Sequence, residues 1–113
     1  MKYFFSLRID ANKDEAEKIT SILGVKPNNI QVGWKYEIKT KDNEYVNFVE
    51  MFLSLLENKY DSLEQVGITR EHISVWMIYA YEEQCNMEFN PVDLKRLGDN
   101  GITLCVSCYK DEL

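Results

Sequence analysis

The chain has 113 residues, of which 45% are apolar and 28% charged, enough to bury the core of one domain and too apolar for a disordered tail. Its 13 lysines and arginines are outnumbered by 19 aspartates and glutamates, which leaves a net charge of −6 and no basic patch. Because nucleic acids and anionic membranes bind clustered cationic groups, neither is expected as a partner.

The sequence favours a single domain in the cytoplasm. No Pro-, Gly- or Ser-rich linker interrupts residues 1–113. The N-terminal apolar stretch is short for a signal peptide, and no apolar run approaches the roughly 20 residues that a membrane-spanning helix needs. Three cysteines cannot all pair within one chain, and they suit a reducing compartment.

The first third of the chain predicts a strand, a helix and a second strand. Residues 3–9 alternate with a period of two, which is typical of a strand. Asn12 followed by Glu15 is a capping box, and it predicts a helix that ends at Gly24. Residues 30–38 alternate strictly between apolar and polar side chains, which predicts a strand with one solvated face.

The middle of the chain predicts a long helix. An apolar stripe at helical spacing begins at about Glu44, where Asp42 or Asn43 could cap the helix. A break is expected near residues 61–62, and Gly67 ends the segment.

The last third predicts a strand, a helix and a strand. Residues 72–81 are apolar on both faces, so this strand is expected at the centre of the sheet. Residues 87–89 are expected to return as a short strand. Asn90-Pro91 is an N-cap followed by proline, which predicts a short helix that ends by Gly101, before a final strand over residues 102–109.

This order of elements predicts an α+β fold. We expect a two-layer sandwich in which three helices lie mostly on one face of a mixed sheet of four to five strands. A ferredoxin-like arrangement is one relative that fits this order, and the sequence leaves the order of the strands open.

Several segments also carry a family resemblance. They are residues 3–9, residues 22–27, the tryptophan-bearing residues 33–36, residues 87–97, and the glycine and final strand over residues 101–109. Together they cover nearly the whole chain and resemble the bacterial family known as domain of unknown function 4279. Relatives often carry an acidic residue before the final tyrosine, where this chain has Ser107-Cys108. The resemblance implies a small bacterial cytoplasmic protein and supplies no catalytic residue.

The residues that could bind a metal or act as nucleophiles are few. Cys105 and Cys108 have Cys-x-x-Cys spacing, but they lie in a predicted strand, where residues three apart point to opposite faces. We interpret these cysteines and Cys85 as buried apolar side chains. The sole histidine, His72, is interpreted as a solvated residue at a strand end. We therefore predict no catalytic residue, no metal site and no cofactor.

Four residues are candidates for contact with a partner. Glu82, Glu83 and Glu88 concentrate negative charge on one loop, which is either a solvated turn or a contact surface for a basic protein. Trp34 is added because it lies on a strand near the sheet edge, whereas Trp76 is expected in the core.

These features favour a non-enzymatic module that binds a protein. Its most specific form is an immunity protein that neutralises a basic toxin such as a nuclease, because an acidic protein can occupy a surface built for polyanions. Two alternatives stay open. One is a small-molecule-binding or enzymatic domain with an aromatic pocket, and the other is a structural homo-oligomer formed through an exposed strand edge.

Overall fold

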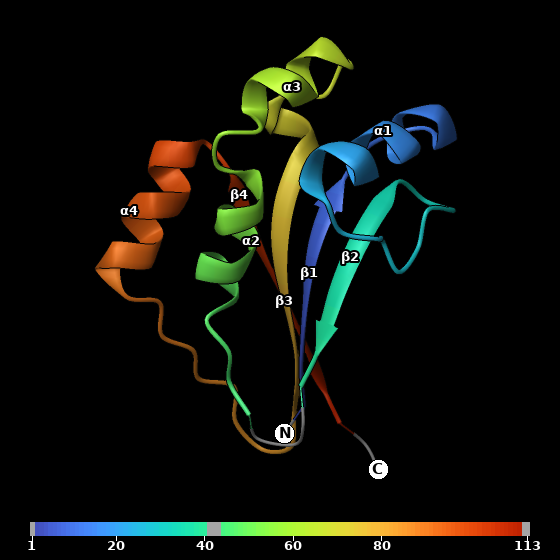
Figure 1. The fold of residues 1–113 in the computed structure, drawn as a ribbon. Coiled ribbons are helices and arrows are strands. Elements are labelled where there is room, and N and C mark those ends of the chain that lie inside the picture. Colours follow the sequence, from blue (N-terminus) through green and yellow to red (C-terminus); the bar gives the residue numbers. More distant parts are fainter. Residues whose placement is uncertain (1, 41–43, 112–113) are drawn as a thin grey trace.

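The protein folds as a single four-stranded mixed sheet with helices packed against it (Figure 1). The computed structural model describes residues 2–40 and 44–111, without the side chain of Lys2. The strands are β1 (Lys2–Ile9), β2 (Trp34–Lys39), β3 (Ile73–Tyr81) and β4 (Thr103–Lys110), in the spatial order β2-β1-β3-β4. β1 is antiparallel to β2 and β3, whereas β3 and β4 are parallel. The predicted central position of residues 72–81 is confirmed.

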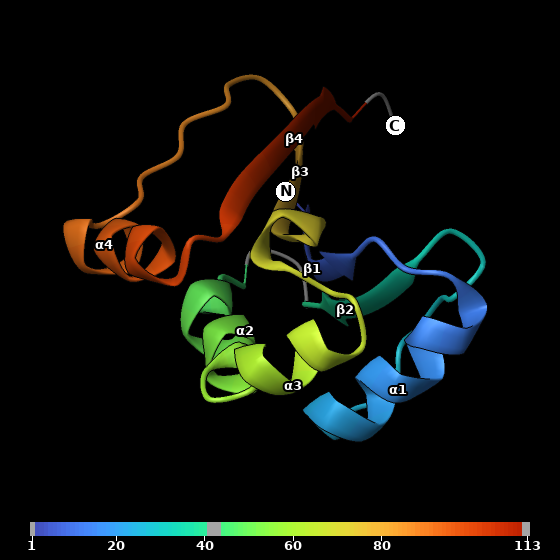
Figure 2. The same cartoon turned by 90° about the horizontal axis from the view of Figure 1, so that it is seen from above.

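The helices lie on one side of this sheet (Figure 2). They are α1 (Lys13–Leu23), α2 (Phe48–Leu56), α3 (Tyr60–Gln65), α4 (Pro91–Asn100) and a short 3-10 turn, η1 (Arg70–His72). The predicted α+β fold is therefore confirmed. The chain order β-α-β-α-α-β-α-β differs from the β-α-β-β-α-β order of the ferredoxin-like motif. None of the helices in the described ranges has the length and apolar content needed to cross a membrane.

Local capping explains where two of these helices begin. The Asn12 side chain accepts a hydrogen bond from the Glu15 N–H at 2.8 Å, and the Glu15 carboxylate accepts one from the Asn12 N–H at 2.9 Å. Asn90 caps α4 in the same way, by accepting from the Asp93 N–H at 2.8 Å. Each cap satisfies a first-turn donor that has no partner within the helix, so both predicted helix starts are confirmed.

The strand predicted over residues 30–38 begins later than expected. Asn29 accepts a hydrogen bond from the Gln31 N–H at 2.7 Å, which forms a turn in place of an extended chain. Gly33 follows with a φ of 81°, and a Cβ at this position would lie 2.8 Å from the Ile9 carbonyl oxygen. The turn leaves Val32 93% exposed, and the strand starts at Trp34. The alternation of residues 30–33 was therefore misleading.

The long helix predicted from about Glu44 is two shorter helices. The caps proposed at Asp42 and Asn43 lie outside the described residues. Asn47 caps α2 by accepting from the Glu50 N–H at 3.1 Å, so the helix starts after the predicted position. The break falls at Asn58, which has a φ of 68°, and not at residues 61–62. A left-handed residue ends α2 because it cannot continue a right-handed helix.

Residues 87–89 do not return as a strand. They belong to an irregular segment, and the side chains of Met87 and Phe89 are partly buried against the core. Their apolar character reflects this packing. The segment matters for function because it forms one wall of the cleft described below.

The core lies between the sheet and the helices. Phe5 and Leu7 of β1 and Val75 of β3 point to the helical side and are fully buried. Phe5 stacks on Phe48 of α2, with ring centroids 4.8 Å apart. Every second residue of these strands faces this layer, as the alternation predicts.

Candidate functional site

An open cleft of about 850 Å³ lies at the end of the molecule where α2 and α4 begin. One wall is the segment before α2, and the other is the segment that joins β3 to α4. The residues that line it are Tyr45, Asn47, Glu88, Phe89, Asn90, Pro91 and Asp93.

The two helix caps position the walls of this cleft. Asn47 holds the first turn of α2, and Asn90 holds the first turn of α4, so both helices start at the cleft. Asn90 also donates a hydrogen bond from its Nδ2 to the Asp93 carboxylate at 2.9 Å, which orients that carboxylate. Arg96 then ties α4 to α2 by ion pairs with Glu50 and Glu57.

The cleft carries negative charge without a matching cation. Glu88 is exposed and Asp93 is partly exposed, and no described lysine or arginine side chain forms an ion pair with either. Burial, the Asp93 carboxylate and Tyr3 together raise the pKa of the Tyr45 phenol. Tyr45 and Asp93 line the same cleft, and Tyr45 is 50% exposed.

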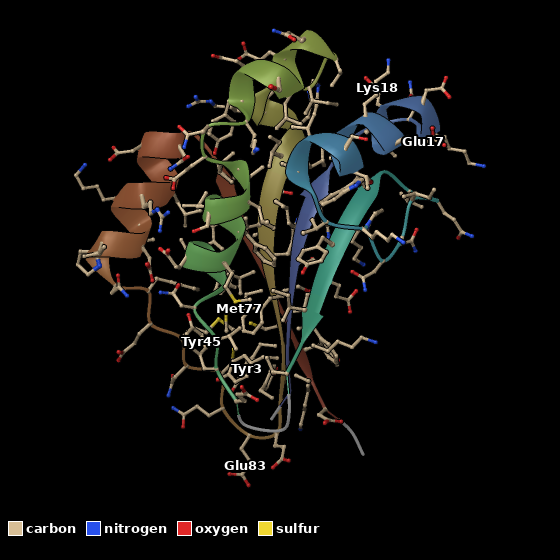
Figure 3. The ribbon with its side chains drawn as sticks, in the orientation of Figure 1. Tyr3, Glu17, Lys18, Tyr45, Met77 and Glu83 are labelled. Atoms are coloured by element: carbon tan, nitrogen blue, oxygen red, sulfur yellow. The ribbon has the colours of Figure 1, made fainter. Side chains whose placement is uncertain are left out.

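A smaller pocket of about 240 Å³ adjoins the cleft and shares Tyr45 and Glu88 with it. Its other lining residues are Tyr3, Met77, Asn86 and Met87. Tyr45 meets Tyr3 edge-on, with ring centroids 5.8 Å apart and planes at 85°. Figure 3 shows Tyr3, Tyr45 and Met77 close together near one end of the core. The inner pocket is thus aromatic, with a carboxylate at its mouth.

The structure separates the three glutamates that the sequence grouped. Glu88 lines the cleft and the inner pocket. Glu82 and Glu83 are exposed in the bend directly after β3 and line neither. Figure 3 shows Glu83 at the tip of this bend, well below Tyr3 and Tyr45. Proximity in sequence therefore did not bring the three carboxylates onto one surface.

The burial of the two tryptophans is the reverse of the prediction, because Trp34 is buried and Trp76 is partly exposed. Trp34 is 1% exposed, because it faces the helices and donates a hydrogen bond from Nε1 to Thr20 Oγ1 of α1 at 3.1 Å. Its ring cannot reach a partner, so Trp34 is not a contact residue. Trp76 lies on the helix-free face of the sheet, where the Arg8 guanidinium stands 4.0 Å from its ring centroid. Trp76 is therefore not in the core.

The cysteines are more exposed than predicted. Cys108 is exposed, and Cys85 and Cys105 are partly exposed. The interpretation as buried side chains was wrong for Cys105 and Cys108 because they lie on β4, an edge strand whose residues are mostly exposed, whereas Cys85 packs partly buried against the core. Cys108 pairs in register with Tyr79 and Cys105 with Trp76, so the two point to opposite faces as predicted. Instead, the Cys85 and Cys108 sulfur atoms lie 3.1 Å apart.

His72 ends the short turn before β3 and is partly exposed. Its Nδ1 accepts a hydrogen bond from the Thr69 N–H at 3.0 Å. Within residues 2–40 and 44–111, no group of three or more His, Cys, Asp and Glu side chains is arranged to hold a metal ion. The hydrogen bond from Thr69 gives His72 a structural role within its own turn.

Sequence reasoning missed most of the cleft. Tyr45 and Asn47 lie in a segment that was predicted to be helical, although it is the irregular approach to α2. Asp93 was not among the candidate residues. A signal was present, because two Asn caps each precede an acidic residue three positions on, at Glu50 and Asp93. That pattern marks two helix starts but cannot show that they meet.

No protein-family model, curated protein or solved structure matches the chain. The resemblance to the domain of unknown function 4279 family stays a prediction, and so does the homo-oligomer formed through a strand edge. The two edge strands that could form one are β2 and β4.

Proposed function

We propose that this chain is a binding module for a basic protein and that the cleft receives a lysine or arginine side chain of that partner. The observation that carries the proposal is the pair of carboxylates, Glu88 and Asp93, that line the cleft and form no ion pair with a described lysine or arginine. Opposite charge on a partner would compensate them on binding.

The lining of the cleft suits a cation with a flat apolar face. Tyr45 offers an exposed ring beside the Asp93 carboxylate, and a guanidinium can stack on such a ring while it pairs with a carboxylate. The cleft suits an anion poorly, although two helices start there. The N–H groups of Glu50 and Asp93 already donate to the Asn caps, and the nearby carboxylates repel negative charge.

The most specific form of the proposal is an immunity protein that occupies the polyanion-binding surface of a basic toxin such as a nuclease. The net charge of −6 supports this form, because it would steer a basic partner toward the protein and speed association. The charge attracts the partner from a distance, and the cleft selects one of its side chains.

The proposal is tested with a blocked Gly-Arg-Gly tripeptide, titrated into the protein and followed by NMR. The backbone amides of residues 44–47 and 86–93 should shift and saturate. A peptide with citrulline in place of arginine has nearly the same shape without the charge, and it should leave these amides unmoved. Equal shifts with both peptides, or none with the arginine peptide, would contradict the proposal.

A matched pair of double variants locates the binding. Glu88→Gln with Asp93→Asn removes both cleft charges and should raise the dissociation constant of the arginine peptide by roughly fivefold to tenfold. Glu82→Gln with Glu83→Gln removes the same charge from the bend outside the cleft and should change it less than twofold. If both pairs weaken binding equally, the net charge and not the cleft accounts for it.

The protein partner itself is sought by affinity capture from the native host at low salt. The wild-type chain should retain a basic protein that the Glu88→Gln, Asp93→Asn variant does not retain. If that protein carries nuclease activity and loses it on binding, the immunity form is supported. Capture of no basic protein would count against the module as a whole.

The inner pocket supports a second candidate, a site for a small organic cation. Tyr3 and Tyr45 meet edge-on there, with Glu88 at the mouth, and aromatic rings with a carboxylate are a known setting for ammonium groups. Tetramethylammonium is the probe. If it shifts the Met77 methyl resonance while the arginine peptide does not bind, the small-molecule function replaces the protein-binding one.

A further inference from the structure

Two thiols from distant parts of the chain lie almost within bonding distance. Cys85 follows β3 and Cys108 lies near the end of β4, 23 residues later, and their sulfur atoms are 3.1 Å apart. That separation is about 1 Å longer than a disulfide bond. A small adjustment of one side chain would close it.

Backbone pairing holds the two segments in this position. β3 and β4 run parallel, and Tyr79 pairs in register with Cys108, which directs the thiol to the side of the sheet that bears the helices. At the end of the pair, the Asp111 N–H donates to the Tyr81 carbonyl oxygen at 2.6 Å. The chain turns after Tyr81 and brings Cys85 back to the same side. The strand register therefore sets the face on which Cys108 lies, and the segment after Tyr81 brings Cys85 to it.

The pair is also accessible to reagents. Cys108 is exposed and Cys85 is partly exposed. The hydrogen bond with Cys85, burial and the nearby Cys85 charge raise the pKa of the Cys108 thiol. A raised pKa lowers the fraction of Cys108 that is thiolate, so we assign the first attack on an oxidant to Cys85.

We propose that Cys85 and Cys108 are a thiol–disulfide modification site, oxidised by a low-molecular-weight disulfide such as glutathione disulfide. The Cys85 thiolate attacks one glutathione sulfur, which breaks the glutathione S–S bond and releases one glutathione thiolate. The Cys108 thiolate then attacks the Cys85 sulfur and displaces the second glutathione thiolate. The protein loses two protons and two electrons, and one glutathione disulfide becomes two glutathione thiols.

Oxidation would tie the segment between β3 and α4 to the edge of the sheet. The bond would close a loop that contains all of α4, from Cys85 to Cys108. Such a closure restricts the unfolded chain and raises the melting temperature, here by about 10 °C for a loop of this length. The inference stands on the sulfur geometry alone and does not depend on the proposed binding function.

The experiment treats the full chain with excess glutathione disulfide at about pH 8, near the ordinary thiol pKa, then blocks free thiols and measures the intact mass. The wild type should retain one blockable thiol, and dithiothreitol should restore three. Trypsin leaves Cys105 and Cys108 together in the peptide of residues 97–110, so peptide mapping alone cannot separate them. The Cys105→Ser variant resolves this, and it should still form the internal bond.

The remaining variants decide the proposal. Cys85→Ser and Cys108→Ser should stop at a mixed disulfide with glutathione and show no rise in melting temperature. Wild type and Cys105→Ser should both show the rise. An internal bond that forms in Cys85→Ser, through Cys105 and Cys108, would overturn the assignment. So would a wild type that forms only mixed disulfides or disulfides between chains.

Discussion

The acidic side chains on and beside helices α2 and α4 form two groups, and the groups differ in whether a cation pairs with them. Arg96, in the middle of α4, pairs with Glu50 in the first turn of α2 and with Glu57 directly after that helix. At the N-terminal ends of the two helices, Glu88 and Asp93 line the cleft. Figure 1 shows both helices starting at the same end of the molecule. Arg96 therefore pairs with the glutamates of α2, whereas the two carboxylates that line the cleft form no ion pair with a described lysine or arginine.

The ion pair between Arg96 and Glu57 belongs to a continuous polar network. The Tyr60 hydroxyl donates to Asn100 Oδ1 at 2.7 Å, and Asn100 Nδ2 donates to Glu57 at 3.2 Å and to the Arg96 carbonyl oxygen at 2.8 Å. The Arg70 guanidinium stacks on the Tyr60 ring with 4.1 Å to its centroid. This network joins α2, α3 and α4, so its charges serve the fold. The cleft charges join no elements, which leaves them available to a partner.

The largest effect is expected at Asn100, the buried centre of this network. Asn100→Ala leaves the Tyr60 hydroxyl without its acceptor and should lower the free energy of unfolding by about 2–3 kcal/mol. Among the residues that the structure describes, the neighbouring Asp99 pairs only with Lys95, in an exposed ion pair, so Asp99→Ala should cost less than about 0.5 kcal/mol. Urea denaturation measures both. Equal losses would show that the network adds nothing beyond the helix surface.

A smaller effect, with a distinct pH dependence, is expected at Tyr60. Burial raises the pKa of Tyr60 from 10.0 to about 12, with Arg70 opposing and Glu57 adding to the shift. The unfolded chain therefore releases this proton near pH 10, before the folded chain does, so the stability that Tyr60 contributes falls as the pH rises toward 12.

Tyr60→Phe should cost about 1.5 kcal/mol at neutral pH, because Asn100 loses its hydroxyl donor. The difference in unfolding free energy between wild type and variant should then shrink above pH 10. Denaturation at a series of pH values measures it. A difference that stays constant through this range would show that the phenol titrates alike in both states.

The smallest effects on stability are expected from two single glutamate substitutions, one at a glutamate paired with Arg96 and one at a glutamate that lines the cleft. Glu57→Gln weakens the ion pair with Arg96 and should cost about 1 kcal/mol, since the pair is only partly shielded from water. Glu88→Gln removes no described ion pair and should change stability by less than about 0.5 kcal/mol. The comparison fails if Glu88→Gln is the more damaging change, because the cleft carboxylate would then serve the fold.

Much of the secondary structure could be predicted, and little of the candidate site could. The capping box at Asn12 and the Asn90-Pro91 start were correct, because a cap acts within three or four residues of its own chain. The strand expected at residues 30–33 failed because a side-chain turn at Asn29 competed with the alternation. Of the four predicted contact residues, Glu88 alone lines the cleft and Trp34 is buried.

The sequence by itself determined the elements that short-range rules control, namely the alternating strands, the helix caps, and the acidity of the surface. Only the tertiary structure decided which tryptophan is buried, which two cysteines approach each other, and which carboxylates share a cleft. Each of these depends on contacts between residues that are far apart in the chain. Such contacts follow from strand order and register, which local patterns leave open because side-chain alternation is the same in every arrangement of the sheet.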